Sequence, residues 1–492
     1  MLPPTQERVG DVVVLTPEAQ TELAGNHSMW NDDLRPCTLA EHSWPGTKFA
    51  SLWIGMCLCL PTYSLASGMI ALGMNWWEAV LTIFTGSTIV MIAILLVSHA
   101  GTRFGIPYPV FARLWFGTRG AHFPALARAI IAAGWFGINA WFGGLALNGI
   151  LTRVVPAWNG DSLHIGASFA VFWAVNVFVA MRGPQAIGRL AQFAAPTVGL
   201  GAVALLIWAA MRVHGFGSML AQPATVHGAA FWTVFVPSVV GVIAFWATLA
   251  LNIPDYTRYA KTQRGQMLGQ ISSMPLTMAA FSFVGIAVTS ATLILFGKAM
   301  WNPVDLIVTF PTPVVILGGI IVILASVTIN VGANVMAPAR AFQNLLPKHI
   351  DFAIGAVITG LLCLAMQPWR VLADFGTYIF TWLGTYGAML GAFDGIAIAD
   401  YWLVRQRRLD LAQLYRSDSI YSYAGGFNFR AILALAAGWL LALLGLVTPL
   451  HFLWSGGWIF SLLGGLVAYG LLMRRDPSVI SVEGYETITQ EH

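Results

Sequence analysis

The chain has 492 residues, of which 57% are hydrophobic and only 9% are charged, and its formal net charge is +4. Soluble globular proteins carry about 25% charged residues, so this composition excludes a soluble protein. It also argues against a membrane β-barrel, because the apolar runs are of helix length and lack the short alternating segments of barrel strands.

The first residues predict a cytoplasmic N-terminal tail over 1–47. The opening stretch, MLPPTQERVGDVVVLTPEAQ, is polar and lacks the apolar core of a cleavable signal peptide. We therefore expect the first true helix to direct membrane insertion. The four cysteines, Cys37, Cys57, Cys59 and Cys363, show neither a disulfide framework nor the spacing of a zinc site, and no cofactor is expected.

The apolar runs after residue 47 predict an all-α membrane protein with twelve transmembrane helices. Residues 79–98, for example, contain no charged side chain, and about 20 such residues cross the hydrocarbon core as a helix. The spans are predicted at residues 48–72, 76–99, 124–152, 165–182, 190–212, 230–252, 273–297, 312–335, 351–367, 374–399, 429–448 and 452–473.

The distribution of basic residues predicts the orientation of these helices. Only Arg153, Arg212, Lys298 and Arg370 fall on segments of one side, and the other 21 of the 25 basic residues fall on the side of the N-terminus. Because basic residues are enriched in cytoplasmic loops, both termini are predicted to be cytoplasmic. We expect a multi-pass protein of the plasma membrane, the inner membrane of a bacterium.

Two helix interruptions are predicted at equivalent depths. Pro61 lies in the middle of the first span, and Pro237 and Gly241 lie in the sixth span. Proline in a membrane helix often only kinks it, but matched positions favour two five-helix repeats with inverted topology. The predicted division is repeat one over 48–212, repeat two over 230–399, two further helices over 429–473, and a cytoplasmic tail over 474–492.

Polar and aromatic residues inside the spans indicate a binding site. Trp135 and Asn139 in the third span are four residues apart and share a helix face. Asn334 occupies the equivalent eighth span, and Phe245 and Trp246 lie in the sixth. Intramembrane amides often only hold helices together, and many tryptophans are interfacial anchors. Together, however, aromatic walls and amides suit a flat, uncharged ring, because asparagine offers a donor and an acceptor.

The chain contains no motif of an enzyme or a channel. No HExxH sequence, phosphate-binding loop, paired intramembrane carboxylate or filter-like glycine repeat is present. Asp394 is the only carboxylate well inside a predicted span, and such a group can carry a proton. It could instead reach the cytoplasmic interface.

Seven motifs, found in order over residues 31–475, resemble the nucleobase–cation symporter family. That family includes the bacterial hydantoin transporter and the uracil, allantoin, cytosine and purine permeases. The motifs are NDDLRP (31–36), SLWIGMCLCLPTYSLASG (51–68), GTRFGIPYPVFARLWFGTRGAHFPALARA (101–129), GWFGINAWFGG (134–144), FWATLALNIPDYTRYAK (245–261), NVGANVMAPA (330–339) and DYWLVRQRRLDLAQLY (400–415). The resemblance implies a leucine-transporter-like fold, with inverted repeats of helices 1–5 and 6–10, broken helices 1 and 6, and two C-terminal helices.

The resemblance also implies roles for site residues. Trp135 matches the tryptophan that stacks on the substrate, and Trp246, preceded by Phe245, matches the residue that closes the other face. Asn139 stands where relatives often have Gln or Glu, and Asn334 matches an asparagine that binds substrate. Cys59 maps to a first-helix position near the ligand, where relatives can carry a larger amide.

The sodium site of the family is incomplete in this chain. The resemblance maps its ligands to the carbonyls of Gly55, Leu58 and Ala325 and to the hydroxyl of Thr328. The second hydroxyl is replaced by Ile329, which has no side-chain oxygen. This departure favours a proton over sodium as the coupling cation, although a bound water could fill the gap.

The sequence therefore predicts a secondary transporter, not an enzyme, that imports a nucleobase or related cyclic amide of the uracil or hydantoin type by cation symport. Two alternatives remain. One is an allantoin or purine/cytosine permease with sodium coupling, and the other is a membrane sensor that binds such rings without moving them. An enzyme embedded in the membrane has no supporting motif. We expect a monomer that contacts lipid and substrate, with no nucleic acid.

Overall fold

The computed structural model describes residues 3–25, 29–30, 32, 34–182, 188–346, 349–474 and 476, although the side chains of residues 188–192 and 344 are not described. The predicted C-terminal tail over 474–492 lies outside the described residues except at positions 474 and 476.

Within the described residues, nine helices are long and apolar enough to cross a membrane. They are Trp76–Phe104 (α4), His122–Val154 (α6), Ser162–Met181 (α7), Phe193–Arg212 (in α8, Gly188–Arg212), Ala229–Asn252 (α10), Gln263–Phe296 (α12 and α13), Thr312–Gln343 (α15 to α16), Thr377–Val404 (η4, α19 and η5) and Phe429–Val447 (α20). If the bent pair Gly46–Cys57 (α2) and Leu60–Ala71 (α3) is counted as one span, the number of candidate spans in the described residues rises to ten. Two shorter apolar helices are Phe352–Ala365 (α17) and Gly457–Met473 (α22). These elements overlap the predicted spans, although the one at Gln263–Phe296 begins ten residues earlier than predicted and the one at Thr312–Gln343 ends eight residues later. The number of twelve crossings stays a prediction.

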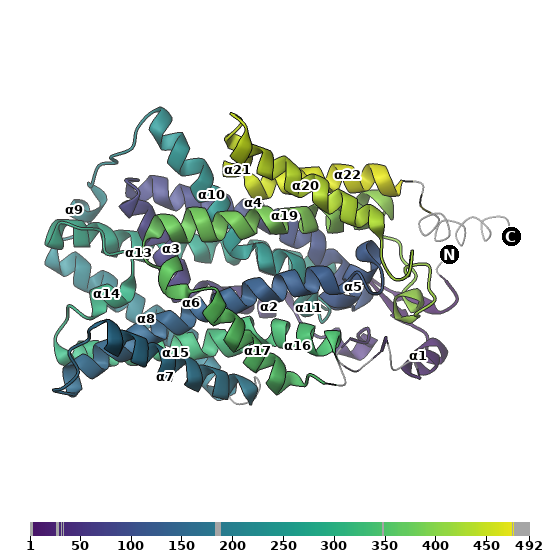
Figure 1. Cartoon of the computed structure of the whole chain (residues 1–492), viewed down its shortest axis with the longest axis horizontal. Coiled ribbons are helices and arrows are strands. Elements are labelled where there is room, and N and C mark those ends of the chain that lie inside the picture. Colours follow the sequence, from purple (N-terminus) through teal and green to yellow (C-terminus); the bar gives the residue numbers. More distant parts are fainter. Residues whose placement is uncertain are drawn as a thin grey trace.

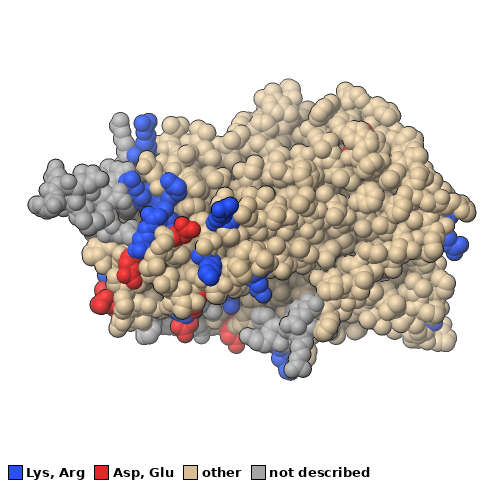
Figure 2. Space-filling view, turned by 180° about the vertical axis from the view of Figure 1, so that it is seen from behind, with Lys and Arg blue, Asp and Glu red and all other residues tan. Residues whose placement is uncertain are grey.

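The helices run side by side along the longest axis of the molecule (Figure 1). Short elements close the two ends. Pro17–Ala24 (α1) and Tyr108–Phe116 (α5) lie at one end, here called the α1 end, and Phe216–Leu220 (α9) and Pro303–Ile307 (α14) lie at the other. Figure 2 shows that the visible lysine and arginine side chains gather mainly at the α1 end. This unequal distribution matches the charge asymmetry in the sequence.

The first span is broken, as predicted, and the break lies just before Pro61. Helix α2 ends at Cys57, Leu58 and Cys59 are non-helical, and α3 begins at Leu60 at an angle of 59° to α2. Pro61 occupies the first turn of α3, where a missing N–H costs nothing because that donor has no helical partner. The break therefore leaves backbone carbonyls at the end of α2 without their usual partners.

The predicted break in the sixth span is wrong. Helix α10 runs without interruption from Ala229 to Asn252 and contains Pro237 in its interior. A proline removes a single helical hydrogen bond, and a membrane helix supported by its neighbours can continue through it. Gly241 has a packing role instead, because a Cβ atom there would lie 2.6 Å from the Ile379 side chain.

Irregular backbone also lies in the spans predicted as the eighth and tenth, in the predicted second repeat. Thr312–Ile329 (α15) and Met336–Leu345 (α16) are joined by a π-helical segment, Asn330–Val335 (η3). The tenth span contains two such segments, Thr377–Leu383 (η4) and Ala399–Val404 (η5), on either side of Gly384–Ile398 (α19). Wide turns of this kind are frequent at functional sites, since they redirect side chains within a helix.

The segment before the first span is folded rather than extended. Gln6–Val9 (β1) and Val12–Leu15 (β2) form an antiparallel hairpin, a small exception to the all-α prediction, and α1 follows it. The buried Gln6 side chain donates to the Leu409 carbonyl over 3.1 Å and accepts from the Leu411 N–H over 2.8 Å. These bonds attach the hairpin to the loop that follows the tenth span.

The remaining short elements connect the spans. They are Leu39–Glu41 (η1), Pro254–Thr257 (α11), Pro368–Val371 (α18), Ala412–Tyr415 (η6) and Phe452–Ser455 (α21). Within the span Gln263–Phe296, α12 covers Gln263–Ile271 and α13 covers Met274–Phe296.

The packing of α19 on α22 gives a testable prediction. Gly395 faces the backbone of α22, and an added Cβ atom would lie 2.1 Å from the Leu462 carbonyl oxygen and 3.0 Å from the Leu466 nitrogen. Backbone atoms cannot rotate away, so Gly395→Ala must separate the two helices. Overpacking of this kind costs about 1–3 kcal/mol. We expect the purified variant to melt several degrees below the wild type in a thermal unfolding assay.

Gly470 provides the matched control on α22. A Cβ atom there would meet no atom within 4 Å. Since alanine is favoured over glycine in a helix by about 1 kcal/mol, Gly470→Ala should melt at or above the wild-type temperature. Equal melting temperatures for the two variants would show that the close approach of α19 and α22 does not limit stability.

Candidate functional site

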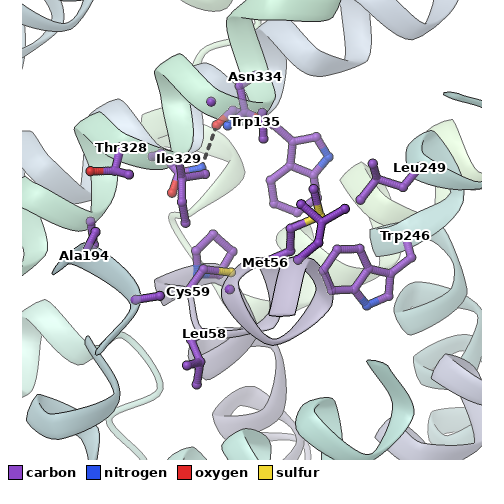
Figure 3. A pocket seen from close by; sticks show the side chains of 18 of the residues that line it. Met56, Leu58, Cys59, Trp135, Ala194, Trp246, Leu249, Thr328, Ile329 and Asn334 are labelled. Atoms are coloured by element: carbon purple, nitrogen blue, oxygen red, sulfur yellow. Dashed lines mark hydrogen bonds between the residues drawn. The ribbon is translucent and has the colours of Figure 1, made fainter. Parts of the chain in front are cut away.

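A cavity of about 690 Å³ lies where the break in the first span meets α6, α10 and the eighth span (Figure 3). Its lining includes Cys59, Trp135, Asn139, Phe245, Trp246 and Asn334, the six side chains predicted to contact substrate. It also includes Gly55, Leu58, Ala325, Thr328 and Ile329, the positions of the incomplete sodium site. The fold thus gathers residues from four spans around one space, whereas their roles in binding remain predictions.

The aromatic wall of the cavity comes from α6 and α10. The ring centroids of Trp135 and Phe245 are 4.9 Å apart at 74°, and those of Phe245 and Trp246 are also 4.9 Å apart, at 75°. These edge-to-face contacts are the favoured geometry of aromatic pairs. Phe245 therefore contacts both indoles with its ring. Trp53 in α2 supports Trp246 from behind, at a centroid distance of 5.2 Å.

Asn139 presents an unsatisfied oxygen in this wall. Its Nδ2 donates to the Trp135 carbonyl of the same helix over 3.0 Å, and its Oδ1 is buried with no hydrogen-bond partner in the part of the chain that the structure describes. The side chain is only 1% exposed. A buried acceptor that lacks a donor costs about 1–3 kcal/mol, so a ligand N–H at this oxygen would be favourable.

Asn334 lies in the π-helical segment η3, which packs against α6. Its Nδ2 donates to Asn330 Oδ1 over 3.0 Å, and among the described residues none donates a hydrogen bond to its Oδ1. The wide turn of η3 places Asn334 on the cavity lining, where Figure 3 shows it near Trp135. Cys59 lies at the break of the first span, where its Sγ shares a 3.2 Å hydrogen bond with Thr62 Oγ1.

The predicted cation ligands lie together around the break. A Cβ atom on Gly55 would meet nothing within 4 Å, so this residue borders open space. The hydroxyl of Thr328 donates to the Leu324 carbonyl over 2.7 Å, and its lone pairs remain available. Ile329 lines the same wall and supplies no oxygen. Among the described residues, no group of three or more His, Cys, Asp or Glu side chains could hold a metal ion.

Asp394 lies away from the cavity, between α19 and α22. Its Oδ2 accepts a 3.1 Å hydrogen bond from Trp458 Nε1, its Oδ1 has no hydrogen-bond partner among the described residues, and the residue is 0% exposed. The structure therefore does not bring Asp394 together with the predicted substrate or cation residues.

Several lining residues escaped prediction. Met56 and Leu249 extend the apolar wall, and Thr248 adds a hydroxyl beside them. The lining also includes Lys48, Arg128 and Tyr256, from the parts of α2, α6 and α11 that lie toward the α1 end. Arg128 shares a helix face with Trp135 and Asn139, at spacings of seven and eleven residues, and this pattern is visible in the sequence.

A polar network at the α1 end of the cavity connects α6 to the residues after α10. Arg128 Nε donates to Asn252 Oδ1 over 3.4 Å, and Asn252 Nδ2 donates to Asp255 Oδ2 over 3.4 Å. Burial raises the pKa of Asp255, although the Tyr108 N–H that donates to its Oδ1 over 2.8 Å acts in the opposite direction.

Comparison with known sequences identifies relatives over nearly the whole chain. A family described as permeases for cytosine/purines, uracil, thiamine and allantoin matches residues 36–465. The purine-uracil permease NCS1 of Arabidopsis thaliana is 40% identical over 423 residues, which cover 84% of this chain and 70% of that protein. The allantoin permease of Bacillus subtilis strain 168 is 37% identical over 470 residues, which cover 93% of this chain and 96% of that protein.

Solved structures show the same fold. The inward-facing conformation of the transporter Mhp1 matches with a TM-score of 0.78 and 24% identity, covering 93% of this chain and 98% of that chain. Its closed conformation with bromovinylhydantoin bound, described as a nucleobase-cation-symport-1 family transporter, matches with a TM-score of 0.72 and 26% identity, covering 93% and 100%. These relatives are permeases and transporters, not enzymes. The chain therefore belongs to the nucleobase–cation symporter family of membrane transporters.

Proposed function

We propose that this member of the family imports a small planar cyclic amide, of the uracil or hydantoin type, together with a cation. One observation carries the proposal: Trp135, Asn139, Trp246 and Asn334, from three different spans, line the same cavity. The indoles offer stacking surfaces, worth about 0.5–1.5 kcal/mol beyond area burial, and the amides select rings with matching polar edges. The substrate class is also consistent with the bromovinylhydantoin bound by Mhp1.

We propose further that the α1 end faces the cytoplasm of a bacterial cell. The excess of basic residues on the predicted N-terminal side supports this orientation. Because Lys48, Arg128 and Tyr256 extend the cavity toward the α1 end, the structure would then correspond to a state that releases substrate inward. Rocking of one group of helices against the rest would close this side and open the other.

An uptake experiment tests the proposed function. The full chain is reconstituted in vesicles with an imposed pH gradient, and accumulation of radiolabelled uracil, hydantoin, allantoin and hypoxanthine is measured. We expect saturable accumulation of at least one of these rings above the outside concentration. Saturable binding without accumulation would support a sensor, and the absence of both would refute the proposal.

The cation is proposed to be a proton, because Ile329 removes one oxygen from the predicted sodium shell. This gives a prediction: Ile329→Thr should make ring binding sodium-dependent, since sodium prefers a full shell of oxygen ligands. We expect 100 mM NaCl, compared with choline chloride, to tighten ring binding about tenfold in the variant and less than about twofold in the wild type.

A second threonine on the same span controls for the added hydroxyl. Ile320 lies in α15 and is 51% exposed on the outer surface. Ile320→Thr should leave the sodium response at the wild-type level. A wild-type protein that already responds strongly to sodium would refute proton coupling as the main mode.

A further inference from the structure

Three asparagines from two spans form a continuous hydrogen-bonded chain that ends at the cavity. Asn176 in α7 donates through Nδ2 to the Phe172 carbonyl over 3.2 Å. Asn330 in η3 donates through Nδ2 to Asn176 Oδ1 over 3.3 Å and to the Phe136 carbonyl over 3.1 Å. Asn334 then donates through Nδ2 to Asn330 Oδ1 over 3.0 Å. Asn176 and Asn330 are fully buried.

The direction of this chain is fixed by backbone carbonyls. A carbonyl oxygen can only accept a hydrogen bond, so each side chain that contacts one must turn its NH₂ group toward it. Reversing the Asn330 amide would place Oδ1 against the Phe136 oxygen and would cost two hydrogen bonds. Since Asn330 Oδ1 is thereby committed as an acceptor, Asn334 must offer it Nδ2. The oxygen of Asn334 is then the atom to which no described residue donates a hydrogen bond.

Asn139 is oriented in the same way by a carbonyl of its own helix. Its Nδ2 is held by the Trp135 oxygen, and its Oδ1 is the unpartnered atom. Both asparagine side chains of the cavity therefore have a fixed orientation, in which the NH₂ group is bonded within the protein and the oxygen is available to a ligand. This removes the ambiguity of an isolated asparagine, which could present either end to a ligand.

We propose that Asn330 and Asn176 are positioning residues, which hold Asn334 as a hydrogen-bond acceptor so that the bound ring must carry an N–H group at that point. With Asn139 oriented alike, the preferred ligands are rings with two N–H donors, such as a cyclic urea unit, H–N–C(=O)–N–H. Rings with an unprotonated nitrogen at either position are disfavoured, because two lone pairs would face each other. This inference rests on the proposed function and specifies its substrate class.

The test compares two ligands that differ at one ring position. Uracil has an N–H at N3, whereas cytosine has an unprotonated nitrogen there. Dissociation constants are measured for both, and for 1-methyluracil and 3-methyluracil, with the purified full chain. We expect the wild type to bind uracil at least about tenfold more tightly than cytosine. In Asn330→Ala, Asn334 can rotate, and the preference should fall to less than about threefold.

Two further variants separate positioning from loss of structure. Asn330→Asp, protonated in this buried place, can still donate to the Phe136 carbonyl and accept from Asn334, so it should keep most of the preference. Ser168→Ala removes a buried hydroxyl of α7 that has no hydrogen-bond partner among the described residues. This variant should keep the full preference for uracil over cytosine. If Asn330→Ala does not fold, Asn176→Ala serves in its place, since it removes one of the two acceptors that orient Asn330.

The outcomes distinguish this inference from the proposed function. The positioning role alone would be overturned if the wild type binds uracil and if Asn330→Ala or Asn176→Ala keeps the full preference for uracil over cytosine. Equal binding of uracil and cytosine by the wild type would overturn it as well. A wild type that binds none of the rings would overturn the proposed function and, with it, the inference.

Discussion

Replacing Trp135 with alanine is expected to weaken binding of the transported ring by about 10- to 100-fold. Removal of an aromatic side chain that stacks on a base costs about 1–3 kcal/mol, and the vacated space would fill with water. The Trp135 ring also contacts Phe245 at 4.9 Å, so its loss leaves that neighbour less well oriented. The effect is measured as the dissociation constant of the purified protein for the best ligand of the uptake panel.

Two controls accompany this variant. Trp135→Phe keeps a flat ring and should lose less than about tenfold in affinity. Trp208→Ala removes an indole that packs on Phe310 at 4.7 Å, away from the cavity lining, and should leave affinity unchanged. Equal affinity of Trp135→Ala and the wild type for the ligand would show that the ligand ring does not stack on Trp135.

Asp400→Asn is expected to produce the largest loss of stability, about 3–5 kcal/mol. Asp400 Oδ2 lies 3.0 Å from Arg405 Nε, and the two side chains are 0% and 1% exposed. Tyr469 of α22 donates to Asp400 Oδ1 over 2.7 Å, so the carboxylate also connects α22 to the end of the tenth span. Asparagine retains the volume but removes the negative charge that faces the buried guanidinium of Arg405. The change is followed by thermal unfolding in detergent.

The exposed ion pair between Arg416 and Glu22 provides the matched control. Its oxygen and nitrogen are 2.6 Å apart, but the side chains are 34% and 62% exposed. Exposed pairs contribute about 0–1 kcal/mol, so Glu22→Gln should change the melting temperature little. Combining Asp400→Leu with Arg405→Met removes both charges and should be less harmful than Asp400→Asn alone. Equal losses for Asp400→Asn and Glu22→Gln would refute the structural role of the buried pair.

The membrane class and the position of the spans followed from the sequence because they depend on local properties. A run of about 20 apolar residues must form a helix in lipid, where every backbone group needs an internal partner. Pro61 marked the break in the first span for a similarly local reason. The cavity residues Trp135 and Asn139 could be paired from their spacing alone, since four residues make one helical turn.

Other features depended on packing between distant segments. Pro237 and Gly241 carry the same local signal as Pro61, yet α10 is continuous and Gly241 fits against Ile379. The π-helical turn at Asn330–Val335 has no distinct composition, and it arises where α6 and α7 supply partners for Asn330. The hairpin at Gln6–Leu15 is likewise held by the distant residues Leu409 and Leu411.

The sequence by itself determined that this chain crosses a membrane in many helices, which family it resembles, and which aromatic and amide side chains stand at the right depth. Only the tertiary structure decided that they border one cavity and which end of each amide is free. The reason is that burial in lipid is imposed on each segment separately, whereas the direction of an asparagine side chain depends on carbonyls supplied by other helices.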